Sequence, residues 1–169
     1  MSLRTARNSD ASSIAALSIE VWLGTYLKRG VSAFFADYAL ETFTTSRTEA
    51  LITDPGQFIL VSENEDGIDG FIRVSSGSKA PVPGCSETEL ATFYVQPRHQ
   101  GKGVGTRLLQ AAIEKCRQDG VDSIWLATNA ENFPAIGFYL AHGFRHAGET
   151  QFRIGTEGFL NNVYSCELA

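Results

Sequence analysis

Apolar and polar positions follow two different periods along the chain, and the period changes near residue 56. Before that point apolar residues recur at helical spacing, and Asp10 stands where it can cap the first helix. This part predicts a strand over 2–6 and helices over 8–26, 32–43 and 46–54. The following part is β-like and predicts strands over 57–63, 68–76 and 87–95. The turn NEDG makes the first two of these strands an antiparallel pair.

The second half of the chain alternates strands with helices. An apolar face centred on Leu108 and Leu109 predicts a helix over 105–119, which Gly120 ends. A strand over 122–128, a helix over 131–143 and closing strands over 144–150 and 161–168 follow. No repeat or linker interrupts this order. The sequence therefore predicts a single mixed α/β (α+β) domain over 1–169.

Composition narrows the class of protein. The net charge of −5 and the pI of about 5.2 argue against a nucleic-acid binder, which usually carries a basic surface. Three widely separated cysteines form no C-x-x-C pair, so neither a metal site nor a disulfide framework is indicated. No apolar run approaches the roughly 18 residues of a membrane span, and the N-terminus lacks a signal core. We therefore expect a cytoplasmic protein with neither a membrane nor a nucleic-acid partner.

Three glycines at alternate positions, Gly101, Gly103 and Gly105, stand between the strand over 87–95 and the next helix. Small residues before a helix N-terminus let a phosphate approach the backbone N–H groups. The P-loop pattern fails here because Lys102 lies between glycines. Both frames of G-x-G-x-x-G fail because their sixth positions hold Thr106 and Leu108. A tight turn that binds nothing is the structural alternative.

Two motifs carry a resemblance to a known family. Gln100-x-x-Gly103-x-Gly105 follows a strand that ends in YV, and NFPAIGFYLAHGF occupies 132–144. In both segments the chain resembles the GCN5-related N-acetyltransferase (GNAT) superfamily. The resemblance implies a mixed sheet of about six to seven strands, splayed in the middle and flanked by about four helices. It also implies an enzyme that uses acetyl-CoA as co-substrate and no metal.

The resemblance assigns roles to individual residues. The backbone from Gln100 to Thr106 is expected to wrap the pyrophosphate of coenzyme A, and Asn132 to contact the pantetheine or the leaving group. The full set of expected cofactor contacts is Tyr94, Val95, Gln100, Gly101, Lys102, Gly103, Val104, Gly105, Thr106, Asn132 and Tyr139. Asn132 is equally suited to capping a helix. Arg98, Lys102 and Arg107 are candidates for neutralising phosphate, as is His99, whereas His142 and His146 are expected at the surface.

Two residues are candidates for the chemistry of acetyl transfer. Tyr139 matches the family's motif tyrosine and is the candidate general acid for the leaving thiolate, with a buried core tyrosine as the alternative. Glu89 shares strand parity with Val95 and is the candidate general base for the attacking amine. Glu87 has the same parity, and a water chain or a solvated carboxylate also stays open.

The acceptor is expected to be a primary amine of a small molecule. Trp22 and Tyr26 are i and i+4 on the first helix and are candidates to cradle an ammonium, with core packing as the alternative. The chain also resembles, more loosely, the PaiA-like polyamine acetyltransferase branch. Acetylation of protein N-termini or lysines and a catalytically silent coenzyme A-binding module are the alternative functions. Whether the chain is a monomer or a homodimer stays open.

Overall fold

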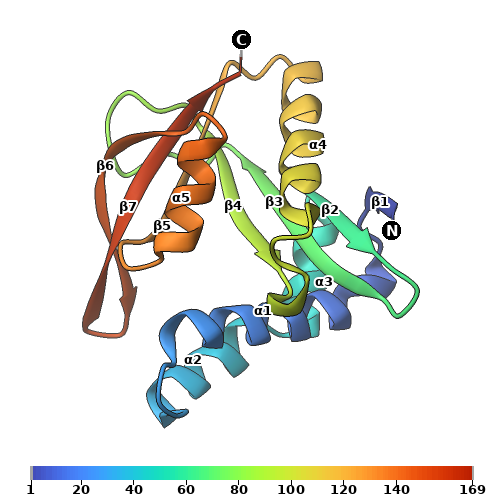
Figure 1. The fold of residues 1–169 in the computed structure, drawn as a ribbon, viewed down its shortest axis with the longest axis vertical. Coiled ribbons are helices and arrows are strands. Elements are labelled where there is room, and N and C mark those ends of the chain that lie inside the picture. The colour runs from blue at the N-terminus through green and yellow to red at the C-terminus, as the bar shows by residue number, and fades with distance from the viewer. Residues whose placement is uncertain (1, 169) are drawn as a thin grey trace. The chain divides into compact units, whose positions relative to one another are not determined.

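The computed structural model describes residues 2–168, which form seven strands, five α-helices and two short 3-10 helices (Figure 1). The elements are β1 (Ser2–Thr5), η1 (Asn8–Asp10), α1 (Ala11–Tyr26), α2 (Ala33–Thr42), α3 (Thr45–Thr53), β2 (Gln57–Glu63), β3 (Ile68–Ser76), β4 (Thr88–Val95), η2 (Pro97–His99), α4 (Val104–Gln118), β5 (Ser123–Asn129), α5 (Phe133–Ala141), β6 (Arg145–Ile154) and β7 (Glu157–Glu167).

The strands pair in the order β1-β2-β3-β4-β5-β7-β6. β4 and β5 are parallel, with Glu89 opposite Trp125, whereas β5 and β6 each pair with β7 in antiparallel fashion. The expected mixed sheet is therefore confirmed, and the five α-helices are those that the sequence pattern predicted, against the about four that the resemblance implied. The chain groups into two compact units, residues 1–74 with 92–112 and residues 75–91 with 113–169. Each unit is described by itself below.

In the first unit, helices pack against both faces of the sheet. Ile14 and Leu17 of α1 pack with Ile59, Val61 and Phe71 from β2 and β3 in one buried cluster. Gly70 precedes Phe71 on β3. A Cβ at Gly70 would lie 3.3 Å from Val104 Cγ1 and 3.2 Å from Leu108 Cδ1, so α4 covers the face of β3 opposite to Phe71. Adjacent strand residues point to opposite faces. Close packing of α4 on β3 therefore favours glycine at position 70.

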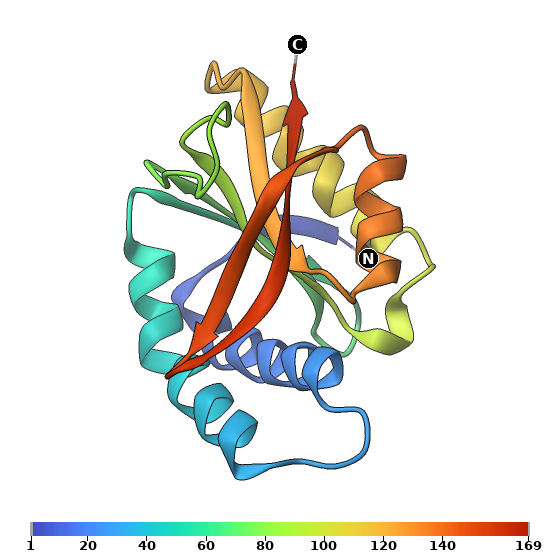
Figure 2. The ribbon, with the colours of Figure 1, turned by 90° about the vertical axis from the view of Figure 1, so that its left-hand side faces the viewer.

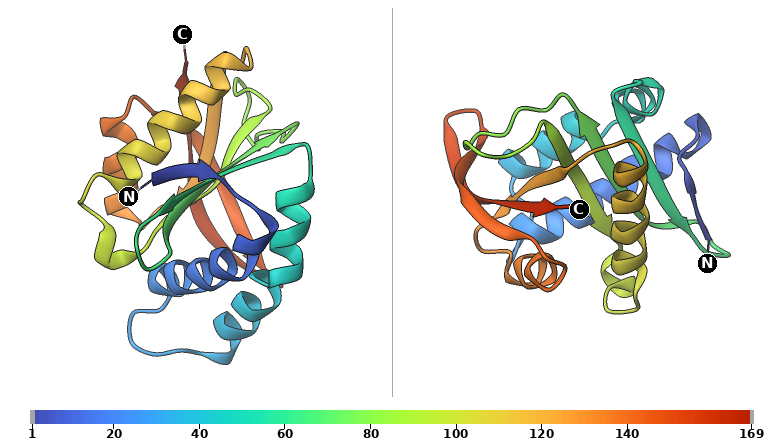
Figure 3. Two further views of the ribbon diagram at one scale, coloured as in Figure 1. Left: turned by 90° about the vertical axis from the view of Figure 1, so that its right-hand side faces the viewer. Right: turned by 90° about the horizontal axis from the view of Figure 1, so that it is seen from above.

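The prediction that Asp10 caps the first helix is confirmed in position but not in hydrogen bonding. Asp10 stands at the N-cap of α1 but makes no side-chain cap hydrogen bond there. Its Oδ2 instead accepts hydrogen bonds from Arg7 N at 2.7 Å and Arg4 Nη1 at 2.7 Å, and Arg4 Nε also donates to Glu63 at 2.9 Å. Arg4 lies on β1, which pairs with β2 at the edge of the sheet (Figure 3). The carboxylate therefore ties β1 to the start of α1.

In the second unit, the last two strands are longer than the sequence pattern indicated. β6 and β7 form one long antiparallel hairpin, red in Figure 2, that turns at Gly155 with φ of +58°. Phe152 lies opposite Phe159 along it, so residues 151–160, left unassigned from the sequence, belong to the hairpin. β7 also pairs with β5 from Asn129–Asn161 to Ser123–Glu167. Tyr139 of α5 and Phe144 are among the buried residues of this unit.

Candidate active site

The glycine loop between β4 and α4 contains two residues in the left-handed region. Gly101 has φ of +73° and Gly103 has φ of +81°, a conformation that residues with a Cβ adopt only at a cost. Gly105 has no positive φ and lies in the first turn of α4, which begins at Val104. Gly101, which occupies a variable position of the family motif, is thus as constrained as Gly103.

Open space borders this loop. A Cβ added at Gly101 or Gly103 would meet no atom within 4 Å outside its chain neighbours, so backbone conformation, not crowding, requires glycine there. The first N–H groups of an α-helix have no acceptor within the helix, and they carry a partial positive charge. The exposed side chains of Lys102 and Arg107 flank this helix start. The residues present therefore fit a pyrophosphate.

Gln100 fastens the loop to the end of β4. Its Nε2 donates a hydrogen bond to the carbonyl oxygen of Val95 at 3.1 Å. The ring of Tyr94 packs edge-on against Phe71, with centroids 5.7 Å apart. A Cβ at Gly70 would lie 3.1 Å from the Tyr94 carbonyl oxygen, so β3 approaches β4 closely here. The first motif residue therefore bonds the strand end that the family resemblance assigns to the pantetheine arm.

Tyr139 lies inside the second unit. The residue is 7% exposed, and its ring centroid lies 5.7 Å from that of Phe138 and 5.5 Å from that of Phe144. Burial raises the pKa of the phenol above its usual value. The hydroxyl therefore keeps its proton throughout the neutral range. A phenol that holds its proton this firmly serves a developing thiolate better as a hydrogen-bond donor than as a full proton donor.

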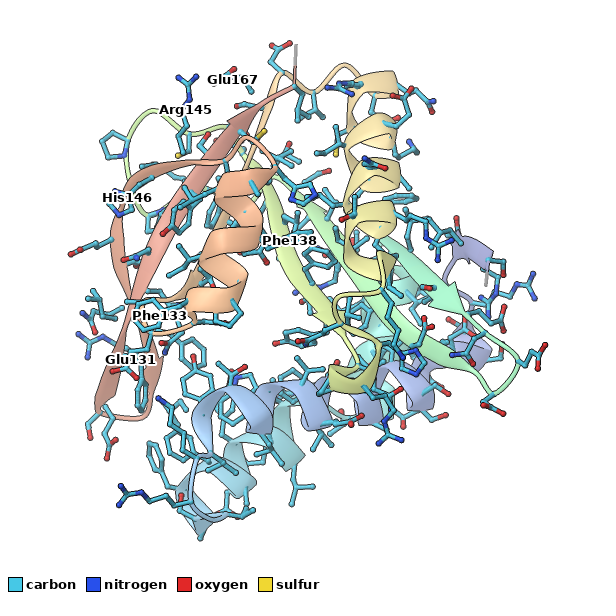
Figure 4. The ribbon with its side chains drawn as sticks, in the orientation of Figure 1. Glu131, Phe133, Phe138, Arg145, His146 and Glu167 are labelled. Carbon is cyan, nitrogen blue, oxygen red and sulfur yellow. The ribbon has the colours of Figure 1, made fainter. Side chains whose placement is uncertain are left out.

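Asn132 caps α5. Its Oδ1 accepts a hydrogen bond from Ala135 N at 3.3 Å, and its carbonyl oxygen accepts from Ile136 N at 3.0 Å. The capping role left open by the sequence is therefore present. Phe133, the next residue, is 73% exposed at the start of this helix (Figure 4).

Glu89 is held by a residue that the sequence reasoning missed. Ser78 Oγ donates to Glu89 Oε2 at 2.5 Å, and Ser78 N donates to the carbonyl oxygen of Glu87 at 2.8 Å. The indole Nε1 of Trp125 donates to the Ser78 carbonyl oxygen at 3.1 Å. Ser78 lies in the loop GSKAPVPG, where nothing in the spacing points to a partner for a strand carboxylate. Glu87 is exposed, whereas Glu89 is half-buried.

The candidate acceptor aromatics form a packed cluster in the first unit. Trp22 is 5% exposed, with ring centroids 4.6 Å from Tyr26, 4.8 Å from Tyr38 and 5.9 Å from Phe35. The i and i+4 contact is therefore present. Trp22 itself has the burial of a core residue, whereas Tyr26 and Tyr38 are half-buried. Contact with an acceptor stays a prediction, and it is best suited to the two tyrosines.

Two of the three histidines, His142 and His146, lie in the second unit. His146 is exposed on β6, as expected, and its ring packs edge-on against Tyr164 at 5.6 Å (Figure 4). His142 is half-buried rather than at the surface, because its ring lies 4.1 Å from that of Phe138 and its Nδ1 lies 2.7 Å from the Phe138 carbonyl oxygen.

Among residues 2–168, no group of three or more His, Cys, Asp or Glu side chains is arranged to hold a metal ion. No helix in this range has both the length and the apolar character needed to cross a membrane.

The family model of the acetyltransferase (GNAT) family matches residues 22–144, which include the glycine loop and α5. The chain belongs to this family. The resemblance carried by Gln100-x-x-Gly103-x-Gly105 and the segment 132–144 is thereby confirmed.

Curated relatives within the GNAT family differ in how much of their length is matched. The L-amino acid N-acyltransferase MnaT of Escherichia coli (strain K12) is 30% identical over 144 residues, 85% of this chain and 79% of that protein. The N-acetyltransferase 8B of Homo sapiens is 26% identical over 124 residues, 71% of this chain. The L-methionine sulfoximine/L-methionine sulfone acetyltransferase of Pseudomonas paraeruginosa is 34% identical over 95 residues, 56% of this chain. The chain spans about half the length of the last two relatives, 52% and 54%.

Solved GNAT structures share the fold. The PaiA N-acetyltransferase of Thermoplasma acidophilum, in complex with coenzyme A, matches 99% of both chains with a TM-score of 0.76 and 18% identity. The yncA acetyltransferase of Salmonella typhimurium, with its cofactor acetyl-CoA, matches 100% of this chain and 94% of that chain with a TM-score of 0.69 and 22% identity.

Proposed function

We propose that this GNAT protein transfers the acetyl group of acetyl-CoA directly to the primary amine of a small molecule. The observation that carries the proposal is the loop from Gln100 to Thr106. Two of its glycines hold left-handed conformations, its first residue bonds the end of β4, and it leads directly into α4. A backbone arranged in this way binds a pyrophosphate through N–H groups.

The chemistry requires a neutral amine and a stabilised leaving group. Bound acetyl-CoA supplies an acetyl group that is already activated as a thioester. The amine nitrogen forms a bond to the carbonyl carbon, the carbon–sulfur bond breaks, and the sulfur leaves with the electron pair. The nitrogen then loses one proton to become an amide, and the thiolate gains one to become a thiol. The attacking ammonium, with a pKa near 10.4 for a lysine-like amine, must first lose a proton. Net transfer yields an amide, free coenzyme A thiol and no change in oxidation state.

In the proposed mechanism, each step is assigned to a side chain or a backbone group. Glu89, directly or through water, takes the proton from the amine, and Ser78 fixes one of its carboxylate oxygens. The backbone N–H at the end of β4 is assigned to the thioester carbonyl oxygen, where negative charge develops. Tyr139 donates a hydrogen bond from its hydroxyl to the departing sulfur, consistent with the raised pKa of that phenol. Asn132 keeps α5, and with it Tyr139, in place.

An amino-acid-like amine is the first acceptor to test. MnaT acts on L-amino acids by its name, and the Pseudomonas relative acts on L-methionine sulfoximine and L-methionine sulfone. The similarity to PaiA supports the fold alone at 18% identity, so a polyamine is the second acceptor class to test. The half-buried rings of Tyr26 and Tyr38 supply faces suited to a cation.

The test is an acceptor screen at fixed acetyl-CoA that measures release of free thiol. Amino acids, their sulfone and sulfoximine derivatives, polyamines, aminoglycosides and lysine peptides form the panel. Thiol release with a small amine supports the proposal, and Glu89→Gln, which keeps the size of the side chain, serves as the matched inactive control. Turnover of peptides alone would move the function to protein acetylation. Calorimetric binding of coenzyme A without turnover of any amine would contradict an acetyltransferase and favour a coenzyme A-binding module.

A further inference from the structure

Asp69 of β3 is a buried carboxylate with unusually few partners. The residue is 1% exposed, its Oδ2 accepts a hydrogen bond from Asn64 Nδ2 at 3.1 Å, and its Oδ1 has no hydrogen-bond partner among the described residues. A carboxylate removed from water is unfavourable unless a cation or several donors face it. The imidazole of His99 faces this carboxylate, with Nδ1 3.6 Å from Oδ2.

Backbone hydrogen bonds bring Asp69 and His99 together. Gln96 N donates to the carbonyl oxygen of Asp69 at 2.8 Å, which extends the contact of β3 with the chain beyond the end of β4. His99 N then donates to the Gln96 carbonyl oxygen at 2.8 Å, and Gln100 N donates to that of Pro97 at 3.3 Å. His99 therefore stands directly before the first motif residue and above the buried carboxylate.

Other charges near His99 already have partners. Glu20 of α1 lies 3.9 Å from Arg98 Nη2 and accepts a hydrogen bond from Gln96 Nε2 at 3.1 Å. Lys102 is exposed further along the loop. Asp69 is consequently the carboxylate that faces His99, whose side chain is 26% exposed.

We propose that the contact between His99 and Asp69 braces the foot of the pyrophosphate loop, and that the loop binds coenzyme A most tightly when both side chains are present. Asp69 is the positioning residue of the pair. The imidazole in this place faces the buried carboxylate and holds the residue before Gln100, close to the site of an anion. This inference rests on the proposed coenzyme A site and goes beyond the family motif, which includes neither residue.

The test measures the association constant of dephospho-coenzyme A by calorimetry at one fixed pH. This ligand keeps the pyrophosphate and lacks the 3′-phosphate, so a change in affinity reports on the pyrophosphate loop. We expect His99→Gln to bind about threefold to tenfold more weakly than the unaltered protein, the size expected for the loss of one polar contact. His99→Arg, whose permanent charge faces the buried carboxylate of Asp69, should keep the affinity of the unaltered protein.

Asp69→Asn should also bind more weakly, and combining it with His99→Gln should add little further loss, because either change removes the same contact. His146→Gln removes an exposed histidine of the other unit and should leave the affinity unchanged. Equal affinities of the unaltered protein, His99→Gln and Asp69→Asn would overturn the inference while leaving the proposed function intact. Absence of any coenzyme A binding in the unaltered protein would instead contradict the proposed function.

Discussion

The side-chain amide of Gln100 donates a hydrogen bond to the backbone carbonyl of Val95 at 3.1 Å, so the first residue of the cofactor motif closes its own loop. Gln100 is exposed, and its contribution to stability is therefore small. Its bond instead sets the path of the four residues that separate it from β4. A loop that its own hydrogen bonds hold in one path has a lower ordering cost on binding a ligand.

Replacing Gln100 by alanine should weaken coenzyme A binding. Loss of one hydrogen bond of ordinary strength predicts a dissociation constant about threefold to tenfold higher, with little change in melting temperature. Calorimetry with coenzyme A measures the effect. Gln118→Ala, which removes an exposed glutamine from the end of α4, is the matched control. Equal affinity in the two variants would remove Gln100 from the site.

Alanine at Gly103 should affect both stability and binding. The backbone there has φ of +81°, so a Cβ costs about 1–2 kcal/mol of folding free energy although it meets no neighbouring atom. Relaxation of that strain would also move the N–H groups of the loop. Gly30→Ala, at a loop position without a positive φ, is the control. Denaturation and coenzyme A titration of both variants test this, and an unchanged affinity in Gly103→Ala would count against the pyrophosphate assignment.

The phosphate-binding role of this loop could be predicted from the sequence, because alternating glycines before a helix start are typical of few other structures. The conformation of Gly101 did not follow, since the family motif leaves that position variable. Ser78 and Asp69 were missed for another reason: their partners, Glu89 and His99, lie far along the chain, and only the folded sheet brings them together. One signal in the sequence pointed to a buried role for Asp69. It lies two residues before Phe71, so the two side chains point to the same face of the strand.

Tyr139→Phe should lower kcat about tenfold to hundredfold and leave KM for acetyl-CoA nearly unchanged, because the hydroxyl acts on charge that develops only in the transition state. The raised pKa of Tyr139 also predicts a stability effect. The unfolded chain ionises this phenol near pH 10, earlier than the folded protein does, so folding stability falls as pH rises above about 10. Denaturation at alkaline pH should show a shallower fall in Tyr139→Phe. A variant with full kcat would show that Tyr139 is only a core residue.

Glu89→Gln should reduce kcat/KM most strongly at neutral and acidic pH, where the amine is protonated and a base is needed. The deficit should shrink toward high pH, where free amine becomes abundant. Steady-state rates from about pH 6.5 to about pH 10 measure this. Glu87→Gln, at the exposed position of the same parity, is the control. If Glu87→Gln carries the deficit instead, the roles of the two carboxylates are exchanged.

Asp10→Asn should destabilise the fold in a pH-dependent way. Arg4 holds the pKa of Asp10 below its usual range through a hydrogen-bonded ion pair. Stability from this pair is present above the unfolded value of about 3.9 and is lost as pH falls through the lowered folded pKa. We expect a loss of about 1–3 kcal/mol at neutral pH that diminishes in acid. Urea denaturation of the two proteins at several pH values checks this, and a constant difference at all pH values would contradict it.

The most direct test of the central claim follows the acetyl group itself. Acetyl-CoA with a deuterated acetyl group is incubated with the protein and an amino-acid acceptor, and product and protein are both analysed by mass spectrometry. Direct transfer predicts one labelled acetyl group on the acceptor nitrogen, an equal amount of free coenzyme A and no label on the protein. Label that accumulates on the protein before it reaches the acceptor, or no labelled amide from any amine although coenzyme A binds, would contradict the account.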